Sequence, residues 1–291
     1  MLRGMQVRRE GMRQSGSLAV FGRTGTPTRT GHSRSVRFVT EFSLLGALLA
    51  LYLLLRYSMK GSVSDALDNA HHVVSVERSL GVFSEDSLQR LALNSRGVIR
   101  FLNGYYLFAH FTVTALFFAW LFIARPEGYA RSRRTLIFMT AMALAIHAAY
   151  PLAPPRMIPD LGFVDTGHLY GLSPYGDAQE GLANQFAAMP SLHFGWALLV
   201  GWGALRFGRS KLRLLLIVHP LLTLAAIIIT ANHYWMDAAV ALAIFATACS
   251  FDRMVRRRQT VTASRRGETA LGDEEPAAVA SGTSSAAVTT A

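Results

Sequence analysis

The chain has 291 residues, of which 51% are hydrophobic and only 16% are charged. Because soluble domains carry about 25% charged residues, this composition argues against an ordinary soluble globular protein. The formal net charge of +11 is compatible with nucleic-acid binding, but the basic residues gather between apolar segments, which is typical of membrane proteins instead. The single cysteine, Cys249, excludes a disulfide within this sequence and a cysteine-based metal site.

The apolar residues are grouped in six blocks, and a helix needs about 20 residues to cross a bilayer. The sequence therefore predicts an all-α, polytopic membrane protein with six transmembrane helices, at residues 38–57, 101–124, 135–153, 190–206, 214–231 and 234–251. The first block follows an Arg-rich segment without a small-residue cleavage site, so we interpret it as a retained helix and not as a cleaved signal peptide.

The segments outside these blocks differ in character. Residues 1–36 and 253–291 lack hydrophobic periodicity and are predicted to be disordered tails, which leaves 37–252 as the membrane domain. In the first outer loop, residues 73–93 mix apolar and charged positions and are interrupted at Gly81. This pattern favours short amphipathic helices that lie on the outer leaflet, and a solvated loop is the alternative.

The basic residues predict an orientation. If the six helices alternate in direction, 22 of the 29 Lys and Arg residues fall on the same side of the membrane. The positive-inside rule makes that side the cytoplasm, so we expect both termini to be cytoplasmic. The loops 58–100, 154–189 and 232–233 then face outward. We expect an integral protein of the plasma membrane, and we do not expect nucleic acid as a partner.

Polar residues from three separate segments lie at the predicted outer face. Arg156 follows the third helix, after prolines that end it. Ser191 is a good helix N-cap, and His193 follows in the first turn of the fourth helix. His233 and Asp237 open the sixth helix on one face. Because ionisable groups at a membrane boundary are costly to place, they suggest chemistry more than packing.

These residue types suit a reaction on a phosphate ester. Arginine can donate two hydrogen bonds to phosphate oxygens, and the helix N-terminus at Ser191 attracts anions. The imidazole of His233 can attack phosphorus if its other ring nitrogen donates a hydrogen bond to Asp237. His193 can protonate the leaving alkoxide and later accept a proton from the acceptor.

Three strings carry a family resemblance: Ala-Pro-Pro-Arg at 153–156, Ala-Met-Pro-Ser-Leu-His at 188–193 and Thr-Ala-Asn-His-Tyr at 230–234. With Asp237, they resemble the type 2 phosphatidic acid phosphatase superfamily. Within it, they are similar to the branch of the fungal inositol-phosphoceramide synthases and their bacterial relatives. The resemblance covers about residues 75 to 250, with the motifs in family order.

The resemblance implies a six-helix membrane enzyme without metal or other cofactor, either a lipid phosphatase or an inositolphosphotransferase-like transferase. It implies that His233 is the nucleophile, which forms a phosphohistidine, and that Asp237 orients it. It further implies that His193 is the acid and that Arg156 is a phosphate clamp. The partners would be membrane lipids, with a lipid phosphate as donor and water or a lipid hydroxyl as acceptor.

The sequence departs from the superfamily pattern at two cations. A lysine is expected seven residues before Arg156, where Ala149 stands, and an arginine six residues before His233, where Ile227 stands. A dianionic monoester should suffer more from this loss than a monoanionic diester. We therefore hypothesise that the donor is a phosphodiester lipid and that the reaction is transfer as much as hydrolysis.

Other interpretations stay open at this stage. Taken singly, His193 and the His233–Asp237 pair also fit structural roles, and an interhelical polar contact is the ordinary role of His110. A transporter-like protein, or a catalytically inactive lipid-binding protein of the same fold, is the alternative function. A transporter would more typically show broken helices or internal repeats. Further residues could support the site, although belt, capping or packing roles explain them equally: Tyr150, His147, Asn232 and Tyr234.

Overall fold

The computed structural model describes residues 62–171 and 185–272, together with isolated positions between 36 and 54. The regular elements of these residues are all helical, which confirms the predicted all-α class. The chain divides into two units, residues 1–47 and 48–291, and every candidate site residue belongs to the second. The predicted tail 1–36 and the predicted helix 38–57 lie almost wholly outside the described residues.

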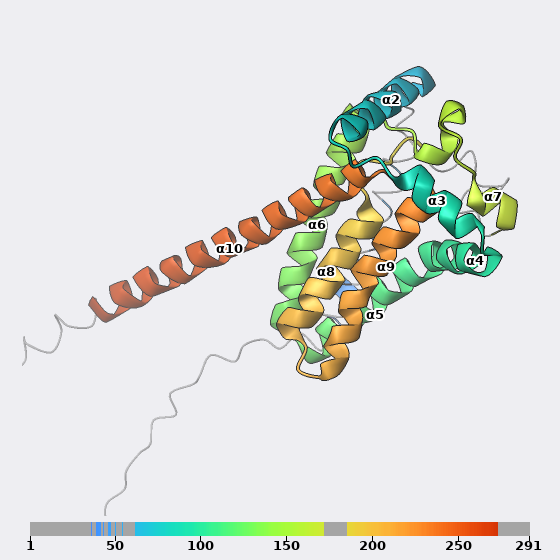
Figure 1. Cartoon of the computed structure of the whole chain (residues 1–291). Helices are drawn as coiled ribbons and strands as arrows, with labels where there is room; N and C mark the ends of the chain where they lie inside the picture. Colours follow the sequence, from blue (N-terminus) through green and yellow to red (C-terminus); the bar gives the residue numbers. More distant parts are fainter. Residues whose placement is uncertain are drawn as a thin grey trace, which may run out of the picture. The chain divides into compact units, whose positions relative to one another are not determined.

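The first loop forms short helices (Figure 1): α2 (Val63–Ser79), α3 (Glu85–Leu93) and α4 (Arg96–Gly104). Ser62 caps α2 by accepting a hydrogen bond from the backbone N–H of Asp65 at 3.4 Å. Gly81 lies between α2 and α3 with φ +69°, a conformation that L side chains rarely adopt. The predicted interruption at Gly81 is therefore confirmed.

A long apolar helix follows, Arg96–Ala124, and it is not uniform. Its first part is α4, its last part is α5 (His110–Ala124), and between them lies a π-helical section, η1 (Tyr105–Ala109). A π-helical turn holds one residue more than an α-helical turn and occurs frequently at functional sites. Here it lies midway along the helix that passes the candidate active site.

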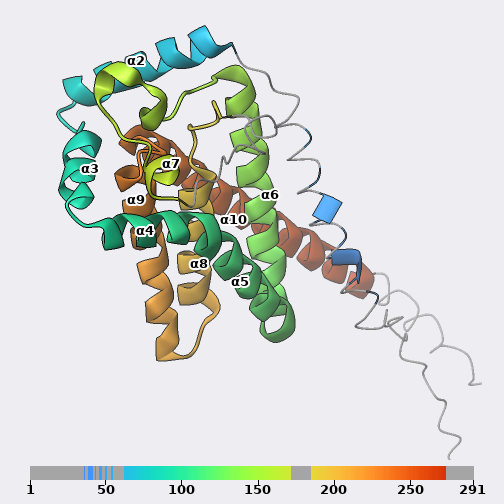
Figure 2. The ribbon, with the colours of Figure 1, turned by 90° about the vertical axis from the view of Figure 1, so that its right-hand side faces the viewer.

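The remaining long helices form a bundle (Figures 1 and 2): α6 (Pro126–Ala149), α8 (Leu192–Phe207), α9 (Leu215–Ile229) and α10 (Trp235–Gly272). α8 contacts α5, α6, α9 and α10, and Ala197, Leu199 and Val200 of α8 are fully buried. Gly195 permits close approach to α6, because a Cβ there would lie 2.8 Å from Cε of Met139. The core of the bundle thus surrounds α8.

α10 projects well beyond its neighbours (Figure 1). A disordered tail was expected from residue 253, whereas the helix continues to Gly272. Residues 253–266 contain neither glycine nor proline and include several arginines, which are good helix formers. The rest of the expected tail, 273–291, lies outside the described residues.

Two helices are long and apolar enough to cross a membrane, Arg96–Ala124 and Trp235–Thr262. The first contains the predicted transmembrane segment 101–124, and the second contains the predicted segment 234–251 except its first residue. Of the other predicted segments, 214–231 forms a shorter apolar helix and 190–206 a helix of 16 residues. Residues 135–149 of the segment 135–153 belong to α6, whose first half carries several arginines that lower its mean hydropathy, and residues 150–153 lie beyond the end of that helix. A six-helix membrane topology is therefore a prediction beyond what these helices establish.

The connection between α6 and α8 returns to the bundle through short turns: η2 (Pro155–Met157), η3 (Pro159–Leu161) and α7 (Thr166–Tyr170). The N–H of Leu152 donates to the carbonyl of Phe186 at 2.7 Å, and the N–H of Ala188 donates to the carbonyl of Leu152 at 3.2 Å. This single bridge aligns the exit of α6 with the residues that precede α8. It brings the segment of Arg156 close to the start of α8.

Candidate active site

His233 lies in the tight connection between α9 and α10. Ala231 has a positive φ of 53°, and the N–H groups of Asn232 and His233 both donate to the carbonyl of Ile227, at 3.0 and 3.1 Å. These bonds close the C-terminal end of α9 and reverse the chain within a few residues. His233, which is 5% exposed, is thereby held at the entrance of α10.

The ring of His233 is fixed through Nδ1. This atom lies 2.8 Å from the carbonyl oxygen of Ala188 and 3.1 Å from Oδ2 of Asp237. Because both neighbours are acceptors, Nδ1 must carry the ring hydrogen and donate it. The other nitrogen, Nε2, then keeps its lone pair, which is the state that a nucleophilic imidazole requires.

Asp237 links the starts of two helices. Its Oδ2 also accepts a hydrogen bond from the N–H of Tyr234 at 2.9 Å, and its carbonyl oxygen accepts one from the N–H of Ser191 at 3.3 Å. The residue is fully buried. Ser191 in turn caps α8, since its Oγ accepts from the N–H of Phe194 at 3.4 Å. The two helix entrances are therefore joined through Asp237.

This junction brings His193 next to His233. The centroids of the two rings lie 6.3 Å apart, with 56° between their planes. A near-attack contact to phosphorus is about 3–3.5 Å, and a hydrogen bond to a leaving oxygen is about 2.8 Å. A single phosphoryl group can therefore contact both rings.

Aromatic neighbours hold the ring of His193. Tyr106 of the π-helical section η1 stacks on it, with centroids 4.2 Å apart, and His110 of α5 lies at 4.5 Å. The ring of His110 also stacks on that of Trp196, with centroids 5.5 Å apart. The sequence suggested an interhelical contact for His110, and the contact is with the candidate acid itself.

Arg156 is connected to the site through a hydrogen bond to Asn232, the residue before His233. Its Nη1 donates to Oδ1 of Asn232 at 2.6 Å, and its backbone N–H donates to the carbonyl of Ala231 at 3.0 Å. Its Nε lies 3.3 Å from Oδ2 of Asp165, and the arginine side chain is only 5% exposed. The guanidinium thus lies beside the connection that holds His233, and a carboxylate already neutralises it.

Asp165 was not among the predicted site residues. Its Oδ1 accepts from the N–H of His168 and caps α7, as expected of a turn residue. Its Oδ2 additionally pairs with Arg156. A phosphate bound to Arg156 would therefore share the guanidinium with this carboxylate.

The proposed supporting residues make different contacts. His147 Nε2 lies 3.3 Å from the carbonyl of Pro190, next to the cap of α8. The hydroxyl of Tyr234 donates to the carbonyl of Ala153 at 3.1 Å. The hydroxyl of Tyr150 instead donates to the carbonyl of Asn69 in α2, at 3.4 Å. His147, Asn232 and Tyr234 thus support the segments that carry the site, whereas Tyr150 is bonded to α2.

The two positions where the superfamily has cations are structurally different. Ala149 is exposed at the end of α6, and Ile227 is fully buried in α9, where its carbonyl accepts the hydrogen bonds that reverse the chain. Ile227 therefore contributes packing at the place where the pattern expects a phosphate-binding arginine. Among the described residues, no group of His, Cys, Asp or Glu is arranged to hold a metal ion.

Two buried carboxyl groups near the site were not predicted. Glu77 of α2 and Glu85 of α3 are 1% and 0% exposed. Each accepts a hydrogen bond from the first turn of α10, Glu77 from the N–H of Met236 at 2.7 Å and Glu85 from the N–H of Trp235 at 3.1 Å. The sequence signal for them is indirect: the N–H groups at the start of a helix need acceptors, but this does not say which residues supply them.

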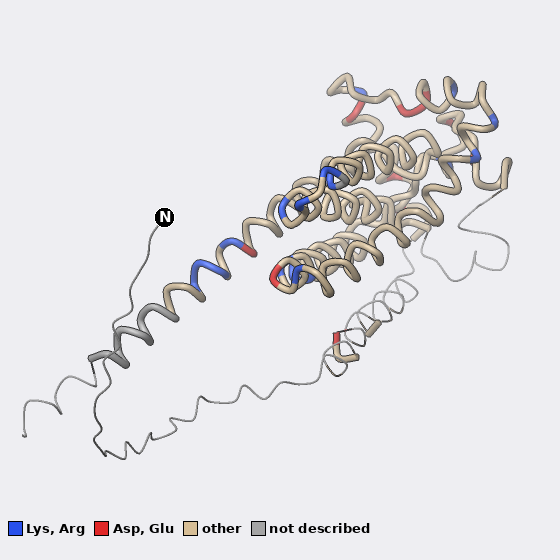
Figure 3. The backbone as a smooth tube through the Cα atoms, turned by 90° about the horizontal axis from the view of Figure 1, so that it is seen from below, with Lys and Arg blue, Asp and Glu red and all other residues tan. Residues whose placement is uncertain are grey.

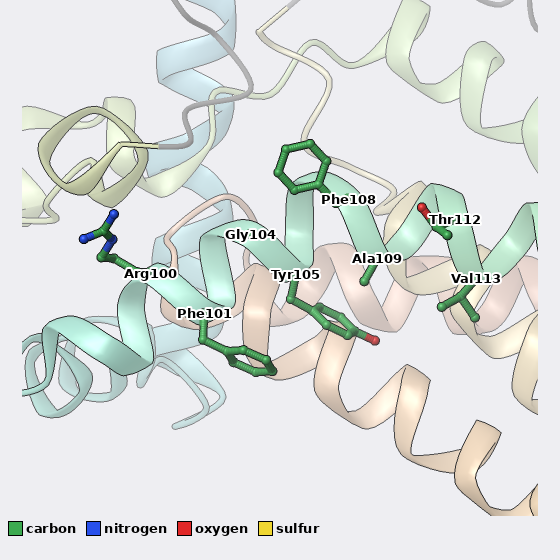
Figure 4. Close-up of a pocket in the computed structure, with 8 residues that line it drawn as sticks. All are labelled: Arg100, Phe101, Gly104, Tyr105, Phe108, Ala109, Thr112 and Val113. Carbon is green, nitrogen blue, oxygen red and sulfur yellow. The ribbon is translucent and has the colours of Figure 1, made fainter.

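An apolar groove of about 520 Å³ runs along the outside of the helix Arg96–Ala124 (Figure 4). The hydroxyl of Tyr105 on this groove is hydrogen-bonded to Nδ1 of His219 in α9. The groove is lined by Arg100, Phe101, Gly104, Tyr105, Phe108, Ala109, Thr112 and Val113.

The residues of this site, the paired histidines at two helix entrances and the nearby arginine, all lie within one region that a family comparison matches. A sequence model described as the PAP2 superfamily matches residues 71–251, which include all of these groups. The chain belongs to the PAP2 superfamily. Its members are usually phosphoesterases, so a phosphatase-type activity is indicated, and the family together with the two apolar helices indicates a membrane protein. No curated protein and no solved structure matches the sequence.

Proposed function

We propose that this PAP2 protein cleaves or transfers a phosphate-linked group on a membrane lipid, through a phosphohistidine on His233. The observation that carries the proposal is the pairing of the two rings, 6.3 Å apart, with Nδ1 of His233 held by Ala188 and Asp237. This arrangement leaves Nε2 of one ring as nucleophile and supplies a second imidazole at the same phosphorus.

The reaction has two steps. Nε2 of His233 attacks phosphorus, and the bond between phosphorus and the leaving oxygen breaks while protonated His193 gives that oxygen its proton. Water or a lipid hydroxyl then attacks the phosphohistidine, His193 takes the proton of the attacking hydroxyl, and the phosphorus–nitrogen bond breaks. Asp237 stabilises the positive charge that develops on the His233 ring, and Arg156 binds the phosphoryl oxygens.

The charges around the site favour a monoanionic donor. Arg156 is already paired with Asp165, and the positions of the two further superfamily cations hold Ala149 and Ile227. A phosphodiester headgroup, as in an inositol phospholipid, needs less positive charge than a phosphomonoester. We therefore propose the inositolphosphotransferase-like branch, with the lipid tails against apolar surfaces such as the groove beside Tyr105 (Figure 4).

The basic residues support an extracytoplasmic site, and we propose the plasma membrane as its location. Asp252 of α10 binds Arg131 and Arg134 of α6 and Arg256 of α10. It lies 15 residues beyond Asp237, about 22 Å at 1.5 Å per residue. Figure 3 shows further basic residues along the projecting part of α10. By the positive-inside rule, this end would face the cytoplasm, with His193 and His233 on the other side.

The test is a pair of variants with a trapping assay. Purified protein is mixed with labelled phosphatidylinositol or phosphatidic acid, quenched in alkali, and examined for acid-labile phosphohistidine. We expect label on the wild type and on the control His72→Ala, which changes an exposed histidine of α2, and none on His233→Ala. Near-normal turnover by His233→Ala would refute the mechanism. Absence of turnover and label in the wild type would favour an inactive lipid-binding protein.

A further inference from the structure

The first turn of α10 is held by carboxyl groups from three elements. The consecutive N–H groups of Tyr234, Trp235 and Met236 donate to Asp237 Oδ2 at 2.9 Å, Glu85 Oε1 at 3.1 Å and Glu77 Oε1 at 2.7 Å. In addition, the indole N–H of Trp235 donates to Oγ of Ser84 at 3.1 Å. Helices α2 and α3 thereby reach the segment that carries His233.

We propose that Glu77 and Glu85 form a proton-sharing pair, with the proton on Glu77, that positions His233 by fixing the first turn of α10. The pair does not touch the reacting atoms, so both residues are positioning residues. The inference rests on the proposed role of His233 as the nucleophile and adds the groups that hold its segment in place.

The hydrogen bonds assign the proton. Glu85 uses both carboxylate oxygens as acceptors, Oε1 for the N–H of Trp235 and Oε2 for the N–H of Ser84 at 2.8 Å. Glu77 accepts through Oε1 alone, and its buried Oε2 receives no N–H or O–H bond from any described residue. Glu85 raises the pKa of Glu77 both through a side-chain hydrogen bond and through its charge, and a hydrogen bond between two carboxyl groups requires one hydrogen. That hydrogen belongs on Oε2 of Glu77.

Electrostatics agree with this assignment. Two ionised carboxylates in contact, buried away from water, repel each other strongly. Burial raises the pKa of Glu77 to about 9, and the hydrogen bond and charge of Glu85 and the charge of Asp237 act in the same direction. The hydrogen bond from Met236 opposes the rise. A neutral Glu77 also limits the negative charge beside a site that must bind an anion.

Glu77 and Glu85 can affect His233 because this residue is attached to both α9 and the start of α10. The N–H of His233 is bound to α9 through Ile227, and its ring is bound to Asp237 in the first turn of α10. The orientation of that ring therefore depends on how the first turn is held relative to α9. Glu77 and Glu85 hold it from outside, because they bind the two residues between Tyr234 and Asp237.

Isosteric variants test the assignment, because glutamine replaces a protonated glutamate better than an ionised one. In Glu77→Gln, the amide oxygen can still accept from Met236 and the amide N–H₂ can donate to Glu85. In Glu85→Gln, an N–H₂ group must face a backbone N–H of either Ser84 or Trp235. We expect Glu77→Ala to lose at least about tenfold in kcat, and Glu77→Gln to recover most of it. Glu85→Ala and Glu85→Gln should both lose at least about tenfold.

Each variant is purified, and kcat, KM, phosphohistidine yield and thermal midpoint are measured on the donor that the wild type turns over. The control is Glu127→Gln, an exposed residue of α6. We expect the losses in kcat with KM changed less than about threefold and the protein still folded. Equal tolerance of both glutamine variants, or equal loss, would overturn the proton assignment. If the wild type forms no phosphohistidine, the proposed function fails instead, whereas the thermal midpoints of the two glutamine variants still test the assignment.

Discussion

Replacing Glu77 by glutamine should flatten the dependence of stability on pH. Burial and the neighbouring Glu85 raise the pKa of Glu77 from 4.5 to about 9 in the folded protein. The folded chain then keeps a proton that the unfolded chain releases above pH 4.5. The stability that this proton contributes is complete below about pH 4.5 and is lost as the pH rises towards 9.

The size of the effect follows from proton linkage. Within this window a single group changes the free energy of unfolding by about 1.4 kcal/mol per pH unit. Between pH 6 and pH 8 the free energy of unfolding of the wild type should fall by roughly 2–3 kcal/mol, and this fall should be absent in Glu77→Gln. For a domain of this size, this corresponds to a difference of about 5–10 °C in thermal midpoint.

The assay is thermal unfolding in detergent at pH 6 and pH 8, followed by intrinsic tryptophan fluorescence. The wild type and Glu127→Gln should lose the same number of degrees between the two pH values, and Glu77→Gln should lose clearly less. Identical losses in all proteins would refute the reasoning, because Glu77 would then not hold its proton in the folded state.

Three further predictions concern the reaction. The first uses a p-nitrophenyl phosphodiester, whose leaving group needs no proton. With this substrate, His193→Ala should still form the phosphohistidine on His233 and accumulate it, which a quenched burst measures. No accumulation would contradict the role of His193 as the base in the second step. Asp237→Asn should lower kcat at least about 100-fold, because the ring of His233 loses its carboxylate partner; activity within tenfold of the wild type would contradict the dyad. Asp165→Asn should lower KM for the lipid phosphate several-fold, because Arg156 no longer shares its charge; an increase in KM would indicate that Asp165 is needed to position the arginine.

The sequence was informative where a local pattern decides the structure. The apolar blocks from residue 101 onward all form helices, because their length and composition favour helix regardless of neighbours. The break at Gly81 and the cap at Ser191 were predicted from residue type alone. The same reasoning indicated that His193 and His233 begin two helices; His193 does lie in the first turn of α8, whereas His233 lies two residues before α10. The structure brings these rings together, while their catalytic roles stay predictions.

The features that the sequence did not predict depend on contacts between residues far apart in the chain. An amphipathic pattern assigns the charges of residues 73–93 to water, yet Glu77 and Glu85 are buried because the N–H groups of α10 need acceptors. Nothing local distinguishes these acids from less buried neighbours such as Asp86, which forms an ordinary i,i+4 pair with Arg90. In the same way, no spacing rule indicates that Asp165 reaches Arg156.

The wide turn at Tyr105–Ala109 has a consequence for how this helix tolerates change. One surplus residue rotates everything after it by about 100° relative to a regular α-helix. Tyr106, within the turn, and His110, just after it, both contact the ring of His193, whereas α4 before it faces α3 and α7. Deleting a single residue there would leave the hydrophobicity of the helix almost intact and turn one of its two ends away from its neighbours. Length variation by one residue at this position should therefore be far more damaging than most substitutions.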